Sequence, residues 1–282
     1  MRRKCRQSTI GVSDRHMVTM RCLDGAYMKK LIVNADDFGL DDETVDWTIK
    51  GFEAGKISSA TIMAGMPATK RAVEYAASHP QFSFGVHLCL VDEKPISHPT
   101  DIPSMIDPRT GTLWKTRQFV IRNFLGLVNV DDIKREMMAQ INVLRDMGLK
   151  ISHLDGHGHN HRLPQSIKAL VAVRDELGGN IPVRRCQDIY VGRPGLLSRV
   201  INGPMQKRLE RAHIPMTDHF LMAAGHTTDE MWFSKAVLSL PDGLTEIGIH
   251  PGMSEDWRRI DCKNCLESDL KDIELVDFRA VK

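Results

Sequence analysis

The sequence predicts an α/β protein whose single domain is a distorted (β/α) barrel, TIM-barrel-like, with about seven strands. Three observations favour this fold. Short apolar runs alternate with segments of helical periodicity along most of the 282 residues. No internal repeat, low-complexity stretch or linker divides them. Ionisable residues follow several of the apolar runs, which is where parallel sheets and barrels carry their active sites.

The apolar runs have the length and composition of strands that are buried on both faces. Strands are expected at residues 31–35, 58–64, 82–90, 150–155, 181–185, 217–222 and 244–249. About seven strands in the 255 residues that follow residue 27 favour an incomplete or distorted barrel over an open sheet.

Helices are expected between these strands. Asp41 or Asp42 can cap the first helix, in which Val45 and Phe52 share an apolar face. Further helices are expected up to residue 79, at 131–148, from 164, at 195–211 and at 227–239. Residues 91–116 are rich in Pro, Asp and Gly and break this rhythm, so we expect a long loop of the kind that is often functional.

The charge of the chain is unevenly distributed. Residues 1–27 carry six Lys or Arg against two Asp, a net charge of +4, and the whole chain carries +2, so residues 28–282 sum to −2. We expect residues 1–27 to be a basic tail outside the fold and residues 28–282 to form one domain. A slightly acidic domain argues against nucleic acid as the main partner, because binding to phosphates requires clustered Lys and Arg.

Several features predict a soluble protein of the cytoplasm. The basic tail is not followed by the apolar segment of a signal peptide, and no apolar run is long enough to span a membrane. Six scattered cysteines lack the dense pattern of a secreted disulfide scaffold. Cys262 and Cys265 form a CxxC pair, which by itself does not make a structural zinc site. The number of subunits is left open, with a homodimer as one alternative.

Two adjacent acids follow the first expected strand, in the sequence NADDFG at residues 34–39. Aspartates in a turn often cap the next helix, but Asp41 and Asp42 already supply that cap. Asp36 and Asp37 therefore require another explanation. His87 lies in the third expected strand, where a lone histidine is more typical of a satisfied core residue than of a ligand.

The most specific signal is a row of histidines after the fourth expected strand. Residues 153–161 read HLDGHGHNH, and in an extended strand the side chains at 153, 155, 157, 159 and 161 would share one face. Burying such a row without a metal ion or a charge partner would be costly. The alternative is a surface loop that binds metal adventitiously. His250 ends the last clear strand at a turn and is a weak signal by itself.

Together these residues predict a metal site with one carboxylate and two imidazoles from different strands. Asp37, His87 and His157 are 50 and 70 residues apart, unlike the closely spaced and mostly thiolate ligands of a structural zinc site. Three protein ligands leave a coordination position open for water. A divalent ion lowers the pKa of such a water to about 7 and polarises a carbonyl group, which are the requirements of hydrolysis at neutral pH.

Four segments carry a family resemblance: LIVNADDFG at 31–39, GVHL at 85–88, HLDGHGHNH at 153–161 and His250-Pro251. In this order they resemble the YdjC-like carbohydrate deacetylase family of the ChbG/HpnK type, which is related to polysaccharide deacetylases. The resemblance runs from about residue 28 to the carboxyl terminus. It implies a distorted (β/α) barrel that removes an acetyl group from an N-acetylated sugar, either a chitooligosaccharide or an acetylated glycolipid.

Carried onto this sequence, the resemblance implies that Asp37, His87 and His157 hold one divalent metal ion and that Asp36 is the general base. His250 stands where a catalytic acid is expected. The resemblance implies Mg²⁺ as the ion. The ligand chemistry favours Zn²⁺ or another transition ion, because Mg²⁺ prefers oxygen ligands over imidazole.

Four further residues are candidates for binding sugar hydroxyls: His159, His161, Arg184 and Asp218. For Arg184 and Asp218, an ion pair or a surface position is an equally good explanation. Two other functions stay open, namely a metal-dependent hydrolase of another amide or ester and a non-catalytic protein that binds a sugar or a metal. The intact pair of acids at 36 and 37 argues against the second, because binding alone needs no free base.

Overall fold

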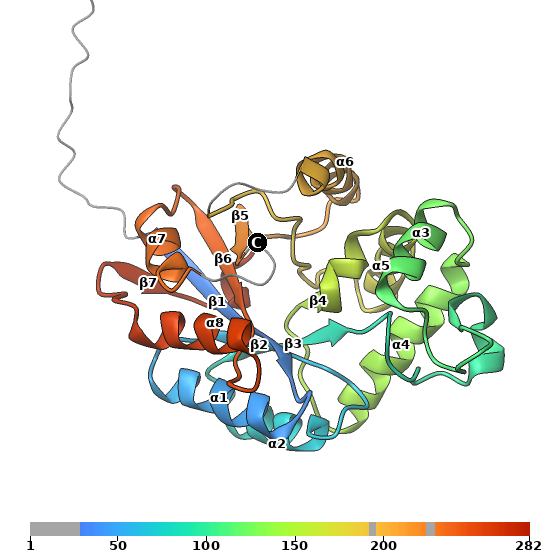
Figure 1. The fold of residues 1–282 in the computed structure, drawn as a ribbon, viewed down its shortest axis with the longest axis horizontal. Helices are drawn as coiled ribbons and strands as arrows, with labels where there is room; N and C mark the ends of the chain where they lie inside the picture. Colours follow the sequence, from blue (N-terminus) through green and yellow to red (C-terminus); the bar gives the residue numbers. More distant parts are fainter. Residues whose placement is uncertain (1–28, 192–195, 224–228) are drawn as a thin grey trace, which may run out of the picture.

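The structure is a computed structural model of the chain and describes residues 29–191, 196–223 and 229–282. Strands and helices alternate along most of this part (Figure 1). The strands are β1 (Lys29–Phe38), β2 (Ser59–Ile62), β3 (Ser83–Leu88), β4 (Leu154–Gly156), β5 (His219–Met222), β6 (Leu244–Ile249) and β7 (Ile273–Leu275). The α-helices are α1 (Asp42–Glu53), α2 (Thr69–Ser78), α3 (Thr116–Phe124), α4 (Val130–Asp146), α5 (Pro164–Glu176), α6 (Leu196–Arg211), α7 (Trp232–Leu238) and α8 (Asp256–Glu267). The 3₁₀ helices are η1 (Pro99–Asp101), η2 (Pro103–Met105), η3 (His157–Arg162) and η4 (Phe278–Ala280).

The seven strands form one parallel sheet, in the order β4-β3-β2-β1-β6-β5 with β7 added beside β1. β7 and β2 share one edge of β1, since Lys29 is in register with Ile273 and, further along, Asn34 with Ser59. The other edge of β1 pairs with β6. The predicted α/β class and the barrel-like arrangement of about seven strands are confirmed.

The side of the barrel between β4 and β5 is irregular. Leu154 and Val183 form a single parallel bridge, and the Val183 N–H donates to the Pro215 carbonyl at 3.0 Å. The strand predicted at 181–185 is therefore wrong. Its apolar residues are present, but Pro182 has no N–H to donate and the segment pairs with its neighbour at one residue only.

Three elements of the structure were not predicted, namely α3, α8 and β7. The sequence of α8, DWRRIDCKNCLE, has no continuous apolar stripe, and β7 is three residues long and only partly buried. Residues 91–115 do form the predicted long excursion, which contains η1 and η2. The helix predicted at 227–239 is shorter in the described part of the chain, where α7 begins at Trp232.

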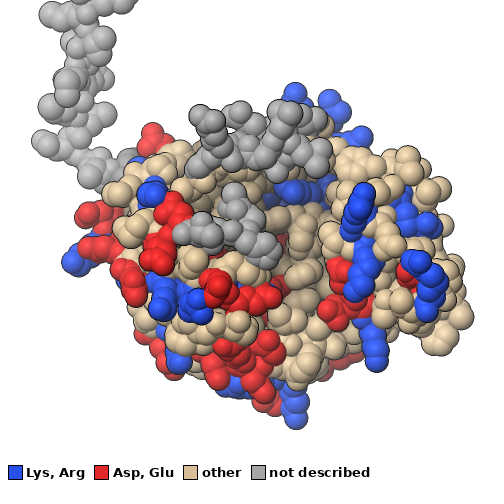
Figure 2. Space-filling view, in the orientation of Figure 1, with Lys and Arg blue, Asp and Glu red and all other residues tan. Residues whose placement is uncertain are grey.

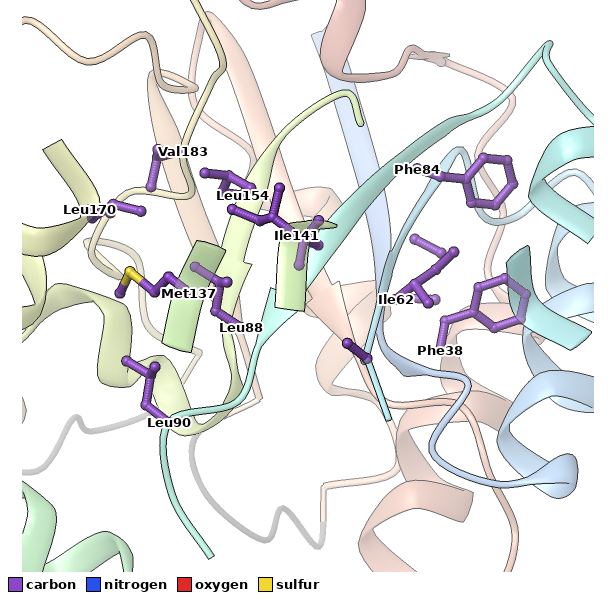
Figure 3. Close-up of a cluster of buried hydrophobic side chains, with 14 of the residues drawn as sticks. Phe38, Ile62, Phe84, Leu88, Leu90, Met137, Ile141, Leu154, Leu170 and Val183 are labelled. Atoms are coloured by element: carbon purple, nitrogen blue, oxygen red, sulfur yellow. The ribbon is translucent and has the colours of Figure 1, made fainter. Parts of the chain in front are cut away.

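Apolar side chains pack on the face of the sheet that the helices cover (Figure 3). Phe38 and Phe84 point toward α1 and α2, with their ring centroids 6.3 Å apart. On the same face, at the β3–β4 end of the sheet, Leu154 packs with Met137 and Ile141 of α4. Each such fully buried side chain stabilises the fold by about 1.5–3 kcal/mol. This packing fixes the carboxyl ends of the strands, where the polar residues lie.

The predicted basic tail at 1–27 lies outside the described residues. Among the helices of the described part, none combines the length and hydropathy that crossing a bilayer requires. Cys262 and Cys265 are both free thiols buried on α8, where they pack rather than form a disulfide.

Candidate active site

The structure brings five of the predicted site residues to one end of the sheet. Asp36 and Asp37 lie near the end of β1 and His87 lies near the end of β3, whereas His157 follows β4 and His250 follows β6. Because all these strands are parallel, their carboxyl ends meet at the same edge, as in other α/β folds that carry active sites there.

Asp37 faces both imidazoles of the predicted ligand set. Its φ of 60° is in the left-handed region, which Asp tolerates better than most residues, and the β1–β2 register is irregular here. Two consecutive acids can therefore both serve the site. Asp37 Oδ1 lies 3.2 Å from His87 Nε2 and 2.9 Å from His157 Nδ1. Burial would raise the pKa of Asp37, but hydrogen bonds to His157 and His87 hold it well below its usual value.

The His87 ring is oriented by an acid on the neighbouring strand. Its Nδ1 lies 2.7 Å from Asp155 Oδ1, and Thr61 Oγ1 donates to Asp155 Oδ2 at 3.0 Å. This leaves Nε2 directed at Asp37. Burial would lower the pKa of His87, but the charge and hydrogen bond of Asp155 raise it to about 10. A carboxylate that fixes the outer nitrogen of a ligand histidine is a common feature of metal sites.

The residues Asp37, His87 and His157 fit a divalent cation. Their three ligand atoms lie within 4.8 Å of one another, and one carboxylate with two imidazoles is a ligand set that transition ions accept. The His157 side chain is 36% exposed, so this side of the group is open to solvent.

A second group of candidate ligands, Asp36, His87 and Asp155, already holds an arginine. Arg184 Nη1 lies 2.6 Å from Asp36 Oδ2 and 2.8 Å from Asp155 Oδ2. The guanidinium neutralises both carboxylates, so this second group does not suit a metal ion.

Arg184 is inside the protein and out of reach of a sugar. Its side chain is completely buried, donates from Nε to Glu246 Oε1 at 2.7 Å and lies over the Phe220 ring. The prediction that Arg184 binds sugar hydroxyls is therefore wrong, and the alternative of an ion pair is what the structure contains.

Asp36 is a buried carboxylate that Arg184 keeps ionised. Arg184 donates to both of its oxygens, at 2.6 and 2.7 Å, and Asn34 Nδ2 donates to Oδ1 at 2.9 Å. Burial would raise the pKa of Asp36, but the charge of Arg184 outweighs this and holds it well below its usual value. Asp36 Oδ2 also lies 3.9 Å from His250 Nε2.

His250 is held by an acid from α8. Asp261 Oδ2 accepts from the backbone N–H of His250 at 2.8 Å and lies 3.3 Å from its Nδ1. Burial would lower the pKa of His250, but the hydrogen bond to Asp261 and the charge of Asp36 raise it. The ring is therefore poised to carry a proton, with Nε2 on the side of Asp36.

Glu246 supplies a third buried carboxyl beside Arg184. Its Oε1 accepts from Arg184, whereas Oε2 has no hydrogen-bond partner among the described residues. Burial raises the pKa of Glu246 to about 7, against the opposing charge of Arg184.

The histidine row does not continue as a strand. β4 ends at Gly156, and η3 contains two left-handed residues, Gly158 and His159, with φ of 57° and 55°. The side chains at 153, 155, 157, 159 and 161 were predicted to share one face in an extended strand, and this is wrong because the chain turns after Gly156. His153 is completely buried, and its ring stacks on Phe278 with the centroids 3.5 Å apart.

Two of the remaining sugar-binding candidates lie where they cannot bind a sugar at the site. His161 is completely buried beside the Arg184 carbonyl, and burial lowers its pKa to about 4. Asp218 accepts from the Leu244 N–H at 2.8 Å, at the amino-terminal end of the sheet and opposite the site. Both predictions are wrong. His159 is partly buried beside the thioether of Met222, and its role stays a prediction.

Sequence reasoning missed the residues that position the site. Asp155 was noticed in the histidine row without a role, and its place opposite His87 in the β3–β4 register is a tertiary feature. Asp261 and Arg258 come from the unpredicted α8. Glu246 lies four residues before His250 in β6, a strand that was predicted correctly. An acid within a buried apolar strand was the signal that could have identified Glu246 as part of the site.

The surface is hollowed between the two halves of the molecule seen in Figure 2, one built from α1 and α8 and the other from α3, α4 and α5. On this face, Lys and Arg side chains are interspersed with Asp and Glu. His157 and His250 are the site side chains with measurable exposure, at 36% and 18%, whereas Asp36, Asp37, His87 and Arg184 are at 2% or less.

Among the proteins that resemble this chain are two relatives and one solved structure. A carbohydrate deacetylase of Thermoanaerobacter pseudethanolicus is 28% identical over 234 residues, which cover 81% of this chain and 83% of that protein. A carbohydrate deacetylase of Halalkalibacterium halodurans is 35% identical over 155 residues, 55% of this chain and 63% of that protein.

The solved structure is from Enterococcus faecalis V583, described as a candidate cellobiose-phosphate cleavage protein. It superimposes with a TM-score of 0.72 at 22% identity, over 89% of this chain and 98% of that one, and shows the same fold. The sequence profile of the YdjC-like proteins matches residues 30–279, nearly the whole described chain. The chain therefore belongs to the YdjC-like protein family.

Proposed function

We propose that this protein is a metal-dependent hydrolase that removes the acetyl group from an N-acetylated sugar. One observation carries the proposal: the cation-binding group of Asp37, His87 and His157 adjoins an ionised carboxylate, Asp36, and a protonatable imidazole, His250. Membership of the YdjC-like family, and relatives named carbohydrate deacetylase, support this reaction class.

One divalent ion would be held by the carboxylate of Asp37 and the two imidazoles of His87 and His157. When bound, such an ion lowers the pKa of a water molecule and polarises the amide carbonyl. Asp155 presents the Nε2 of His87 to this position. The ligand set favours Zn²⁺ or another transition ion over Mg²⁺, which prefers oxygen.

Asp36 would accept the proton of the attacking water. Arg184 keeps this carboxylate ionised and fixes both of its oxygens, so it is ready to accept a proton at any pH near neutral. The lowered pKa also makes Asp36 a weak base, and it would therefore hold the proton only briefly. His250 Nε2, at 3.9 Å, is the nearest imidazole nitrogen on this side.

His250 would donate a proton to the amide nitrogen as the carbon–nitrogen bond breaks, which releases an amine and leaves acetate. Asp261 holds Nδ1 of the ring, so that Nε2 is free to face the substrate. A raised pKa favours the protonated ring that this role requires.

The proposal is tested by acetate release from short chitooligosaccharides and acetylated glycolipids, with the metal content of the protein measured in parallel. We expect Asp36→Asn to lower turnover by at least about 100-fold with its metal content unchanged. We expect His157→Ala to lose both metal and activity. Near-full activity of Asp36→Asn would contradict the mechanism. Hydrolysis confined to other amides or esters, or metal binding without any hydrolysis, would contradict the deacetylase assignment.

A further inference from the structure

The two oxygens of Asp37 have different partners. Oδ1 faces His87 and His157, whereas Oδ2 accepts a hydrogen bond of 2.6 Å from Arg258 Nη2. We propose that Arg258 is a positioning residue that holds Asp37 to one metal-binding oxygen and offsets its negative charge, and that this loss of charge selects against Mg²⁺ in favour of ions that bind imidazole. This inference rests on the proposed function, because it concerns the same cation site.

Arg258 is firmly placed by its surroundings on α8. The residue is 8% exposed, and its guanidinium lies 4.7 Å from the centroid of the Trp257 ring. The turn after β6 closes over it, since a Cβ on Gly252 would lie 3.2 Å from Arg258 Cδ. The side chain therefore has little room to move away from Asp37.

Asp37 is also the partner that Arg258 depends on most. Nη1 is buried without a hydrogen-bond partner among the described residues, and Nε has only a longer contact of 3.5 Å to the exposed Glu255. A guanidinium that has lost most of its water is costly to leave unpaired. Release of Oδ2 to a metal ion would break this pair, so we expect the carboxylate to bind through Oδ1 alone.

The charge of Arg258 reduces the negative charge that the group offers to a cation. Asp37 is the anionic ligand of the group, and a positive charge 2.6 Å from its Oδ2 offsets it. The other two ligands are imidazoles, which bind as neutral groups. Mg²⁺ binds mainly through charged or carbonyl oxygens, so this arrangement weakens the binding of Mg²⁺ most. Zn²⁺ and Co²⁺ keep their affinity for the two ring nitrogens.

Calorimetric titration of metal-free protein with ZnCl₂, CoCl₂ and MgCl₂ at one fixed pH tests the inference. The variants are Arg258→Met, which removes charge and donor, and Arg258→Lys, which keeps the charge. Arg259→Met is the matched control, because Arg259 is the next residue of the same helix, half exposed and paired with Asp256.

We expect Arg258→Met to raise the Zn²⁺ affinity about threefold and the Mg²⁺ affinity about 30-fold, because Mg²⁺ depends more on the negative charge of its oxygen ligand. The ratio of Zn²⁺ to Mg²⁺ affinity then falls about tenfold. Arg258→Lys should lower this ratio less, and Arg259→Met should leave it unchanged. The visible absorption of bound Co²⁺ should weaken in Arg258→Met as its coordination number rises.

Equal changes for all three ions in Arg258→Met would overturn the inference while leaving the cation site in place. If Arg258→Met fails to fold, judged by circular dichroism, Arg258→Gln replaces it as the variant without the charge, and an unchanged ratio in Arg258→Gln would also overturn the inference. Absence of any cation binding by the unmodified protein would instead contradict the proposed function itself.

Discussion

Arg184 donates to both carboxylate oxygens of Asp36, at 2.6 and 2.7 Å, across 148 residues of sequence. The same guanidinium pairs with Asp155 and Glu246, so one cation lies among three carboxyl groups that are shut off from solvent. Removal of one member of a buried ion pair is far more destabilising than loss of a surface pair, because it leaves uncompensated charge in the interior.

Arg184→Met should therefore lower the free energy of unfolding by about 3–5 kcal/mol at pH 7. The loss should be smaller at pH 5, because without Arg184 the pKa values of the three carboxyl groups rise and the groups can become neutral. Urea denaturation at both pH values measures this. Arg145→Met, on the exposed face of α4, is the control and should change stability by less than about 0.5 kcal/mol. An equally small loss in Arg184→Met would show that the carboxyl groups do not need the cation.

Asp261→Asn should move the pH profile of acetate release. A protonated His250 is required of a catalytic acid, so activity falls as pH rises through the pKa of His250. Burial lowers that pKa and Asp261 raises it, so without the Asp261 charge the alkaline limb should shift by roughly one pH unit toward lower pH. Asp256→Asn, at the exposed start of the same helix, is the control. An unmoved alkaline limb in Asp261→Asn would exclude His250 as the acid.

Glu246→Gln should make stability less dependent on pH. The pKa of Glu246 is raised by burial from 4.5 to about 7, so the folded state holds this proton more tightly than the unfolded chain does. Folding stability therefore falls as pH rises from about 4.5 through about 7, by up to about 3 kcal/mol for a shift of this size. Glutamine mimics the neutral acid and should remove this decline. Urea denaturation from pH 5 to 8.5 measures the free energy of unfolding of both proteins. If this free energy changed with pH by the same amount in both, the raised pKa of Glu246 would be contradicted.

Gly85→Ala should weaken the cation site from a distance. A Cβ at residue 85 would lie 2.6 Å from the His153 carbonyl oxygen, so β3 and β4 would have to separate. Such overpacking costs about 1–3 kcal/mol of stability. Because β3 carries His87 and His157 follows β4, we also expect weaker Zn²⁺ binding by titration. Gly203→Ala in α6, where an added methyl group meets no atom, is the control and should be neutral or slightly stabilising. Unchanged Zn²⁺ affinity in Gly85→Ala would show that the spacing of β3 and β4 does not affect the cation site.

The sequence predicted the sheet well where strands are buried on both faces, as with the run at 244–249, which is β6. Such strands are recognised by their apolar composition alone. It failed where pairing depends on backbone donors, as at Pro182, or where an element is short and partly exposed, as with β7. Local composition carries no information on which neighbour a segment pairs with.

The candidate site was predicted in its strand-end residues and missed in the residues around them. Asp36, Asp37 and His250 interrupt or end apolar runs, so their positions could be recognised one at a time. Arg184 contacts Asp36 across 148 residues and Asp261 contacts His250 across 11, and no local pattern distinguishes either residue from a surface charge. The histidine row was misread as a strand because Gly158 and His159 adopt left-handed backbone angles that alternation does not reveal.

The placement of α8 bears on how the protein is synthesised. Helix α8 supplies both Asp261 and Arg258, and the strand that follows it, β7, completes the edge of β1, the first strand of the sheet. A nascent chain on the ribosome thus exposes the amino-terminal half of that β1 edge, and Asp37 lacks its guanidinium partner, until residues 256–275 have been synthesised. We expect ordered cation binding only after α8 and β7 have emerged from the ribosome, with the incomplete sheet as the species that chaperones encounter.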